Sequence, residues 1–263
     1  MTEQWATGAR LIAASPCRWN VAVARGDGTP LWGHDADEQR LSASTIKLAV
    51  LIALFRAVDA GTARLDQRIA LRDEEKVGGS GVLAALDAGL RPTLHDVAHL
   101  MIAISDNTAS NLVITAAGGL AAINAVCADL GATRTVLGRR FLGRAAQAGE
   151  AENLTTARDL TTLLHAILAG TAASPDACAR MLALLRAQNH RERLARHLPE
   201  TLGYAGKTGG LPGTALDAGI ITTPGGPLLI VGIATALPGP FAADETFGQL
   251  ALAAAREWGG VAA

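Results

Sequence analysis

The chain has 263 residues and a formal net charge of −1 at pH 7, with 49% hydrophobic and 18% charged residues. This composition is typical of a soluble globular protein and excludes a disordered chain, and the absence of a basic patch argues against a nucleic-acid partner. No apolar run approaches the roughly 20 residues that a helix needs to cross a bilayer. We therefore expect one folded unit with one substantial core and without a nucleic-acid or membrane partner.

The cysteines and the start of the chain each carry a prediction. Cys17, Cys127 and Cys178 lie far apart, with neither C-x-x-C spacing nor a nearby histidine in a ligand pattern. We expect buried thiols and no metal site. The opening residues, Met-Thr-Glu-Gln-Trp, lack the basic and apolar regions of a secretory signal. This predicts a cytoplasmic protein, with a trimmed secreted form as the alternative.

The N-terminal part of the chain predicts a short helix followed by an antiparallel hairpin. Strand residues run from Arg18 to Arg25, a turn follows at Gly26 to Gly28, and a second strand continues through Trp32. From Ser44, apolar residues recur at helical spacing up to about Gly61. Because this helix is apolar on nearly all sides, we expect it in the middle of the protein.

Helix patterns dominate from Thr93 to about Leu185. In chain order, we predict a helix from Leu94 to Ile104 capped by Thr93, another that begins at Asn107 or Thr108, and a third that is capped by Thr155 and runs to about Leu168. Beyond Gly203, we predict strands from Ala215 to Thr222 and from Leu228 to Ala236, joined by a turn at Pro224 to Gly226, and a final helix from Ala243 to Trp258.

Strands near both ends of the chain with helices between them predict an α/β fold. One antiparallel sheet is built from both termini and flanked by helices, and an all-helical lobe is inserted into it. We assign residues 1–40 and 203–263 to the α/β lobe and residues 41–202 to the helical lobe. The active site of this single catalytic unit is expected at the seam between the lobes, where pockets commonly form.

Three short motifs occur in order along the chain. They are Ser44-Thr45-Ile46-Lys47, Ser105-Asp106-Asn107 and Lys207-Thr208-Gly209, predicted at a helix start, in a turn between helices and just before a strand. S-x-x-K, S-D-N and K-T-G form the motif set of class A β-lactamases and penicillin-binding proteins. Because S-x-x-K alone is common by chance, the weight of the match lies in the combination and its order.

The spacing of Ser44 and Lys47 fits nucleophilic catalysis. Residues three apart share one helical face, so the Lys47 amine can lie beside the Ser44 hydroxyl, which is a weak nucleophile until a base takes its proton. Desolvation and a second cation lower a lysine pKa, whereas an arginine does not release its proton. Of the chain's three lysines, at 47, 76 and 207, two fall in the motifs. Read singly, Ser44 would be a helix cap and Lys47 a surface charge; read together, they favour catalysis.

The chain resembles the class A β-lactamase superfamily over most of its length. Besides the three motifs, it carries Gly79-Ser80-Gly81-Val82-Leu83, the stretch from Ser105 to Leu112, and Asn153-Leu154-Thr155-Thr156-Ala157 in the expected order. The resemblance implies that Ser44 forms an acyl-enzyme, that Lys47 is its base, and that Ser105 relays a proton to the leaving nitrogen. It further implies that Asn107 holds the substrate amide, that Lys207 and Thr208 bind a carboxylate, and that the N–H groups of Ser44 and Gly210 form the oxyanion hole. The glycines at 209 and 210 would let a substrate backbone approach closely, and the alternative for this segment is a simple turn. No metal or organic cofactor is implied.

Two positions depart from the family pattern. Class A β-lactamases carry a glutamate that positions the deacylating water, followed by a leucine-asparagine pair, in the loop before the third predicted helix. Here the loop reads Arg139-Arg140-Phe141-Leu142-Gly143-Arg144, with Phe141 or Arg140 at the place of the glutamate; Glu150 and Glu152 further along are the alternative bases. Leu216 and Asp217 stand where many β-lactamases have an arginine that helps to hold the carboxylate. We therefore expect slow deacylation and weak binding of penicillin-type substrates.

These features predict a serine hydrolase that forms an acyl-enzyme at Ser44 and hydrolyses a small molecule, a β-lactam or a related amide or ester. The missing glutamate supports an alternative, a covalent β-lactam-binding protein that deacylates slowly. A further alternative is a D-Ala-type carboxypeptidase or transpeptidase, against which the lack of an export signal counts. The substrate and the oligomeric state stay open at this point.

Overall fold

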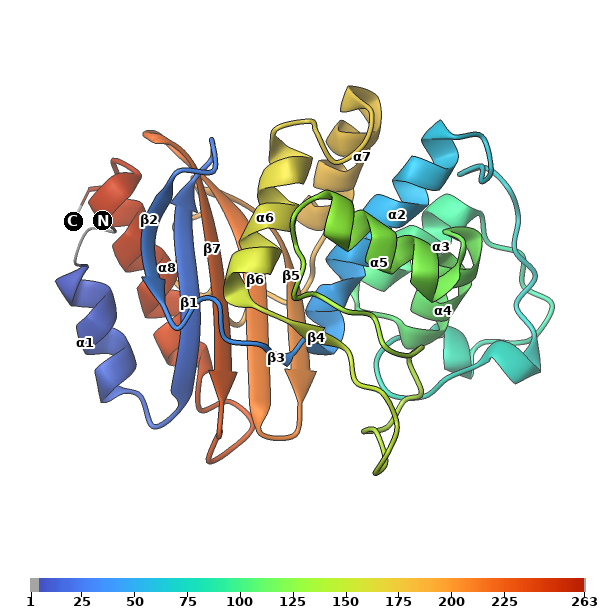
Figure 1. Ribbon diagram of the computed structural model, residues 1–263, viewed down its shortest axis with the longest axis horizontal. Coiled ribbons are helices and arrows are strands. Elements are labelled where there is room, and N and C mark those ends of the chain that lie inside the picture. The colour runs from blue at the N-terminus through green and yellow to red at the C-terminus, as the bar shows by residue number, and fades with distance from the viewer. Residues whose placement is uncertain (1–4, 263) are drawn as a thin grey trace.

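A five-stranded antiparallel sheet forms the centre of the protein, in the computed structural model that describes residues 5–262. Its strand order is β2-β1-β7-β6-β5. The strands are β1 (Arg18–Arg25), β2 (Pro30–His34), β5 (Gly203–Leu211), β6 (Thr214–Thr223) and β7 (Gly226–Thr235). Both ends of the chain thus contribute to one sheet, as the sequence predicts, and the helical part of the molecule lies beside it (Figure 1).

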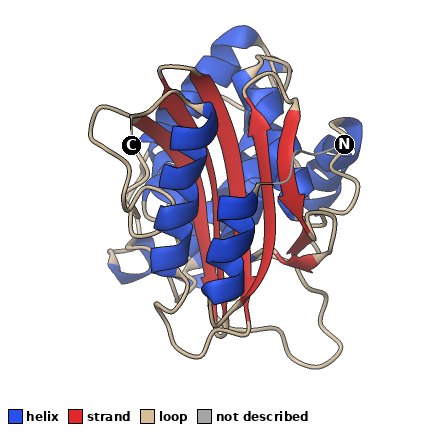
Figure 2. Cartoon of the chain, turned by 90° about the vertical axis from the view of Figure 1, so that its left-hand side faces the viewer, coloured by secondary structure: helices blue, strands red, loops and turns tan. Residues whose placement is uncertain are grey.

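Helices lie on both faces of this sheet and in the helical part of the molecule beside it. They are α1 (Ala6–Ala14), α2 (Lys47–Asp59), α3 (Leu94–Ala103), α4 (Asn107–Ala116), α5 (Gly119–Asp129), α6 (Ala157–Leu168), α7 (Pro175–Arg186) and α8 (Asp244–Trp258). Short elements complete the chain: β3 (Arg40–Leu41) pairs with β4 (Leu154–Thr155), and 3₁₀ turns occur at η1 (Ala43–Ile46), η2 (Asp73–Glu75) and η3 (Leu83–Ala85). Figure 2 shows α1 and α8 on the outer face of the sheet, whereas α6 packs against β1, β6 and β7 on the other face.

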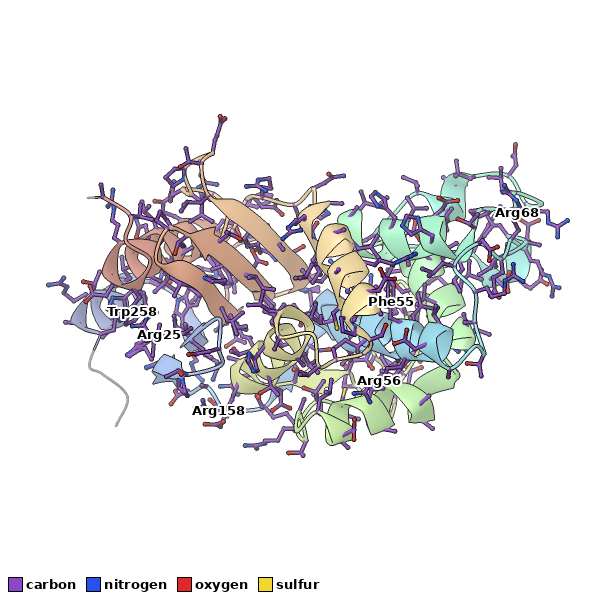
Figure 3. All side chains as sticks on the ribbon, turned by 90° about the horizontal axis from the view of Figure 1, so that it is seen from above. Arg25, Phe55, Arg56, Arg68, Arg158 and Trp258 are labelled. Carbon is purple, nitrogen blue, oxygen red and sulfur yellow. The ribbon has the colours of Figure 1, made fainter. Side chains whose placement is uncertain are left out.

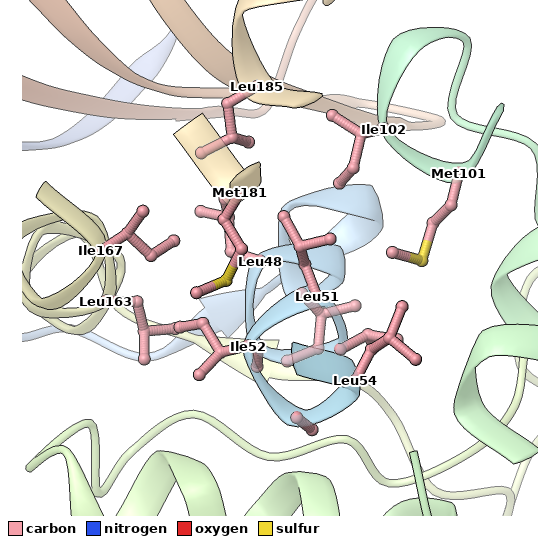
Figure 4. Packing of buried hydrophobic residues seen from close by; sticks show 14 of the residues in the cluster. Leu48, Leu51, Ile52, Leu54, Met101, Ile102, Leu163, Ile167, Met181 and Leu185 are labelled. Atoms are coloured by element: carbon pink, nitrogen blue, oxygen red, sulfur yellow. The ribbon is translucent and has the colours of Figure 1, made fainter. Parts of the chain in front are cut away.

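Helix α2 is the centre of the larger hydrophobic core. Every residue from Lys47 to Phe55 is buried. Its leucines and isoleucine lie among side chains of α3, α6 and α7, including Met101, Leu163 and Met181 (Figure 4). Complete burial of each such side chain contributes about 1.5–3 kcal/mol. The first turn of α2, which carries Lys47, is therefore held by a densely packed scaffold.

The far end of α2 is tied to its neighbours by Arg56. Its Nε donates to the Ala172 carbonyl at 2.6 Å, and its Nη1 pairs with Asp129 at the end of α5 at 2.7 Å. Viewed from above, Phe55 and Arg56 lie on the helical side of the molecule, away from the sheet (Figure 3). The ion pair and the packing together fix the direction of α2 relative to the helices around it.

The alternation of side chains along β5 places the third motif. Tyr204 packs into the core beneath α8, whereas Ala205 packs into the core around α2. Because successive strand residues point to opposite faces, Lys207 and Gly209 share the face of Ala205. Lys207 and Gly209 therefore point towards α2, whereas Thr208 between them points to the other face of the sheet.

Three local predictions need correction. Lys207-Thr208-Gly209 lies within β5, paired with β6 along its whole length, and does not precede a strand; its glycines read as a turn because they are rare inside strands. Helix α2 begins at Lys47, and Ser44 lies in the 3₁₀ turn before it. Thr155 pairs with Arg40 in extended conformation, so the cap of α6 is Thr156, whose hydroxyl accepts from Asp159 N at 2.9 Å.

The division into two lobes stays a prediction, and its outermost residues, 1–4 and 263, lie outside the described part. Helices α6 and α7, which the prediction assigns to the helical lobe, contact both the sheet and α2. No single helix among residues 5–262 is long and apolar enough to cross a membrane; α4 and α5 reach that length and composition only as a pair bent by 81°. The three cysteines are buried free thiols, as expected.

Candidate active site

Two strained backbone positions border the site. Ala43, directly before Ser44, has φ 44°, and Ser105 has φ 59°. Residues other than glycine rarely adopt this left-handed conformation, which costs of the order of 1–3 kcal/mol and persists where the surroundings fix it, commonly at functional sites. Asp35 and Ala236 share this conformation elsewhere in the described chain, and the two positions here lie at or directly before the first residues of two of the three motifs, Ser105 and Ser44.

Lys47 joins the first two motifs. Its Nζ donates to the Ser105 carbonyl at 2.7 Å, to Ser105 Oγ at 3.0 Å and to Asn107 Oδ1 at 3.1 Å. The side chain is completely buried. Burial lowers the pKa of Lys47 well below its usual range, and the Lys207 charge lowers it further, whereas Asp106 acts in the opposite direction. A lysine in such surroundings can be neutral and accept a proton.

Asp106 fixes the segment that faces Ser105 and Asn107. Its Oδ2 accepts from the backbone N–H groups of Val82 and Leu83 at 2.7 and 2.9 Å, and its Oδ1 caps α4 through Ala109 N at 2.8 Å. Asn107 adds a bond from Nδ2 to the Gly78 carbonyl at 3.0 Å. The buried carboxylate of the second motif therefore has a structural task, as expected of a cap, while Ser105 and Asn107 point to Lys47.

Strand β5 lies directly against Ser44. A Cβ atom at Gly209 would be 3.0 Å from Ser44 N and 3.1 Å from Ala43 Cβ, so only glycine allows this approach without a shift. Lys207 is completely buried in the same strand, and its Nζ donates to the Thr208 carbonyl at 2.9 Å. Burial lowers the pKa of Lys207 to about 7, with Asp217 opposing and Arg193 assisting this shift.

A cavity of about 330 Å³ opens at Ser44. Its walls come from all the segments that the motifs mark and from the loop after α5. The lining residues are Ala43, Ser44, Gly79, Ser80, Asn107, Arg139, Phe141, Leu142, Gly143, Arg144, Ala145, Glu152, Asn153, Gly210, Leu211 and Pro212. The structure thus brings Ser44, Asn107 and Gly210 to one cavity, with Lys47 beneath it.

The loop between α5 and β4 places an aromatic ring beside Lys47. The centroid of the Phe141 ring lies 4.4 Å from Lys47 Nζ. Arg140, the other residue considered for the place of the glutamate, points to α4 and donates to Asn111 O at 2.9 Å and Thr115 Oγ1 at 3.1 Å. Of the two, Phe141 is the residue that faces Lys47.

The two glutamates further along this loop are both paired with arginines. Glu150 accepts two bonds of 2.7 Å from Arg144, which hold its pKa at about 2. Glu152 lies 3.4 Å from Arg139 and lines the cavity. A carboxylate with a pKa as low as that of Glu150 is a weak base. Glu152 has the looser contact with its arginine and is the better candidate of the two.

Arg193 is a candidate binding residue that the sequence does not reveal. Its Nη1 donates to the carbonyls of Gly209 at 2.6 Å and Leu216 at 2.8 Å, and its Nε lies 3.2 Å from Asp244. Arg193 thus brings a positive charge to β5 and β6, next to Leu216 and Asp217, which stand in the sequence where many β-lactamases have an arginine. Arg193 lies in the irregular segment after α7, where no periodicity indicates its direction.

Asp217 itself is engaged in a buried network. Its carboxylate accepts from Tyr204 Oη at 2.6 Å and from Leu194 N at 3.0 Å. Burial raises the pKa of Asp217 to about 6, opposed by these two bonds and by the Arg193 and Lys207 charges. Within residues 5–262, no group of three or more His, Cys, Asp or Glu side chains is arranged to hold a metal ion.

Comparisons with known proteins agree with this geometry. Residues 6–258 match the model of the beta-lactamase enzyme family. The crystal structure of a beta-lactamase from Sphaerobacter thermophilus is 38% identical, with a TM-score of 0.94 over 98% of this chain and 99% of that one. Beta-lactamase AER-1 of Aeromonas hydrophila is 28% identical over 224 residues, 84% of this chain and 74% of its own. A PBP-A mutant, solved as an acyl-enzyme complex with penicillin-G, is 27% identical, with a TM-score of 0.82 over 95% of each chain.

Proposed function

The chain belongs to the beta-lactamase enzyme family and is a β-lactamase-like hydrolase, and from this premise we propose that Ser44 attacks a β-lactam or a related small amide or ester and forms an acyl-enzyme. The observation that carries the proposal is the position of Lys47 Nζ. It lies within hydrogen-bond distance of Ser105 Oγ and Asn107 Oδ1, one helical turn from Ser44, under a cavity that Ser44 lines.

In the proposed acylation, Lys47 acts as the base. Its neutral amine takes the proton of Ser44 Oγ as the oxygen bonds to the substrate carbonyl carbon, and the N–H groups of Ser44 and Gly210 stabilise the oxyanion. When the C–N bond breaks, the leaving nitrogen takes a proton from Ser105 Oγ. Lys47 Nζ, 3.0 Å away, returns its proton to that oxygen. The lysine is thus neutral again at the ester stage.

The carboxylate of a β-lactam would be held by Lys207 and Thr208. The amide group would lie against Asn107, with the backbone of Gly209 and Gly210 close to the substrate. Arg193 adds a positive charge behind the same strand through its bonds to Gly209 O and Leu216 O. This arrangement favours anionic substrates, although the sequence alone predicts weak binding of penicillins.

Deacylation is proposed to be slow. Phe141 is the loop residue beside Lys47, in the stretch where the resemblance leads us to expect the water-activating glutamate, and a phenyl ring accepts no proton. The same observation supports a second candidate function, a covalent β-lactam-binding protein. The PBP-A mutant held as a penicillin-G acyl-enzyme supports the view that this fold can retain such an ester.

Mass spectrometry of the intact protein after mixing with penicillin G tests the proposal. We expect the mass to rise by one penicillin and the modified peptide to contain Ser44. The Ser44→Ala variant should show no adduct, whereas Ser80→Ala, which changes another serine of the same cavity, should still form it. A persistent adduct identifies the covalent binding protein, and rapid return to the native mass identifies the hydrolase. An adduct that maps to Ser42 or Ser105 contradicts the assignment.

A further inference from the structure

We propose that Phe141 is a positioning residue for acylation, whose ring covers the Lys47 amine and keeps water from it, so that the base works in a dry environment. This inference rests on the proposed function, because it assigns a task in the acylation step to a residue so far considered only for deacylation. It makes the aromatic residue part of the machinery that activates Ser44.

The ring covers a part of Lys47 Nζ that its hydrogen-bond partners do not occupy. Ser105 supplies its carbonyl and hydroxyl oxygens and Asn107 its Oδ1, all within 3.1 Å of the amine. The Phe141 ring centroid lies 4.4 Å away. Phe141 is half-buried, lining the cavity and also packing against the core around α2. It therefore stands between the solvent in the cavity and a completely buried amine.

The position of the ring is fixed by its own backbone. Asn111 Nδ2 donates to the Phe141 carbonyl at 2.8 Å, and Asn111 Oδ1 accepts from Phe141 N at 3.0 Å. Asn111 follows Asn107 by one turn of α4, so the same helix supplies a partner of Lys47 and the support of the ring. These two hydrogen bonds fix the backbone conformation of the loop at Phe141.

Two effects of the ring on Lys47 oppose each other. The π face attracts a cation, which favours the ammonium form by an amount equal to about one pKa unit. Exclusion of water favours the neutral amine, and complete burial can lower a lysine pKa by up to about 3–5 units. The charged groups that act on Lys47 are Lys207 of β5, which also lowers its pKa, and Asp106 at the start of α4, which raises it. Because the effect of burial is the larger of the two, loss of the ring should raise the pKa of Lys47.

Titration of the lysines in the free protein tests this without any substrate. The chain has only three lysines, so a sample with ¹³C-labelled lysine gives three Cε signals, and loss of a signal in Lys47→Arg and Lys76→Arg assigns them. In Phe141→Ala, we expect the Lys47 midpoint to rise by at least about one unit. In Phe141→Leu, which keeps an apolar cover, it should stay within about half a unit of the parent or fall. The Lys76 midpoint serves as the internal reference, since Lys76 pairs with Asp73 outside the cavity.

Acylation gives the second readout. Below the Lys47 midpoint, a rise of one unit reduces the neutral fraction about tenfold, so the acid limb of the acylation rate should move upwards in Phe141→Ala and not in Phe141→Leu. If Phe141→Ala melts below the assay temperature, Phe141→Gln, which fills the volume with a polar amide, should show the same upward shift. An unchanged Lys47 midpoint in a folded alanine or glutamine variant overturns the inference. Failure of Ser44 to acylate overturns the proposed function instead, and the lysine titration still reports on the ring.

Discussion

Arg193 Nη1 donates to the carbonyl oxygen of Gly209 at 2.6 Å, which joins the segment after α7 to the strand that lies against Ser44. A Cβ atom at Gly209 would lie 3.0 Å from Ser44 N, so a side chain there would require a shift of its neighbours. The arginine thus supports the strand from behind, and its charge lies close to the residues proposed to hold the substrate carboxylate.

Replacement of Arg193 should weaken substrate binding more than it slows chemistry. For Arg193→Ala, we expect the penicillin concentration at half-maximal acylation to rise about tenfold, because the variant removes a positive charge near the proposed carboxylate site, and about 1.4 kcal/mol of charge attraction corresponds to tenfold in binding. The limiting acylation rate should change much less. Stopped-flow acylation at several concentrations separates the two. Arg196→Ala, which removes a neighbouring arginine paired with Glu245 on the surface, is the matched control and should behave as the parent. An equal loss in the limiting rate would show that Arg193 acts on the chemistry.

Replacement of Lys47 by arginine should separate charge from basicity. The guanidinium keeps the cation but does not accept a proton at neutral pH. Acylation of Lys47→Arg should therefore fall by about two to four orders of magnitude, the usual contribution of general base catalysis. Lys76→Arg, the same exchange at a lysine outside the motifs, should acylate normally. The rate of adduct formation by mass spectrometry measures both, and near-normal acylation of Lys47→Arg would remove the lysine from the role of base.

The buried carboxyl of Asp217 should make stability depend on pH. Its pKa is raised from 3.8 to about 6 in the folded protein, so the unfolded chain releases this proton first as the pH rises. Stability from this group is complete below about pH 4 and is lost between pH 4 and pH 6, by about 3 kcal/mol in all. Asp217→Asn removes this ionisation. In urea unfolding, the free energy of unfolding of the variant should therefore rise relative to that of the parent between pH 4 and pH 7. Because the Tyr204 bond lowers this pKa, Tyr204→Phe should extend the loss to higher pH. If the free energies of unfolding of the parent and of Asp217→Asn differ by the same amount at pH 4 and at pH 7, the raised pKa of Asp217 is wrong.

Most of the fold follows from local patterns in the sequence. The strand residues from Arg18 to Arg25, the cap at Thr93 and the apolar residues of α2 predict elements that the structure confirms. The errors occur where tertiary pairing overrides local preference. Thr155 is held extended by Arg40, about 115 residues earlier in the chain, and the glycines of β5 stay in a strand because β6 pairs with them and Ser44 lies against them.

The sequence motifs propose the members of the candidate site, but they do not indicate which residues support them. The motifs identify Lys47, Ser105 and Asn107, and the structure brings their polar atoms together, while their chemical roles stay predictions. The contact of Arg193 with Gly209 and that of Phe141 with Lys47 depend on the course of irregular segments. The asparagine at 111 lies in a stretch that the resemblance marks, but its task as the support of Phe141 becomes visible only in three dimensions.

Deacylation should limit turnover of β-lactams, and Phe141 supplies the test. In the parent, the ring beside Lys47 accepts no proton, so a chromogenic cephalosporin should give a burst of about one equivalent followed by a slow steady state. Phe141→Glu places a potential base there, and general base catalysis typically contributes about a hundredfold to ten-thousandfold.

We expect the gain in the steady-state rate of Phe141→Glu to fall below that range. The bonds from Asn111 hold the backbone at 141 but aim no carboxylate, and the leucine-asparagine pair that follows the glutamate in class A β-lactamases is absent. A carboxylate near Lys47 also favours its ammonium form, so the burst itself should become slower while the steady state becomes faster. Phe141→Gln, which matches the size of the glutamate without its basicity, should not raise the steady-state rate. If the parent turns over rapidly without a burst, another residue activates the water, and Glu152→Gln, which changes the carboxylate lining the cavity, is then the first variant to measure, followed by Glu150→Gln.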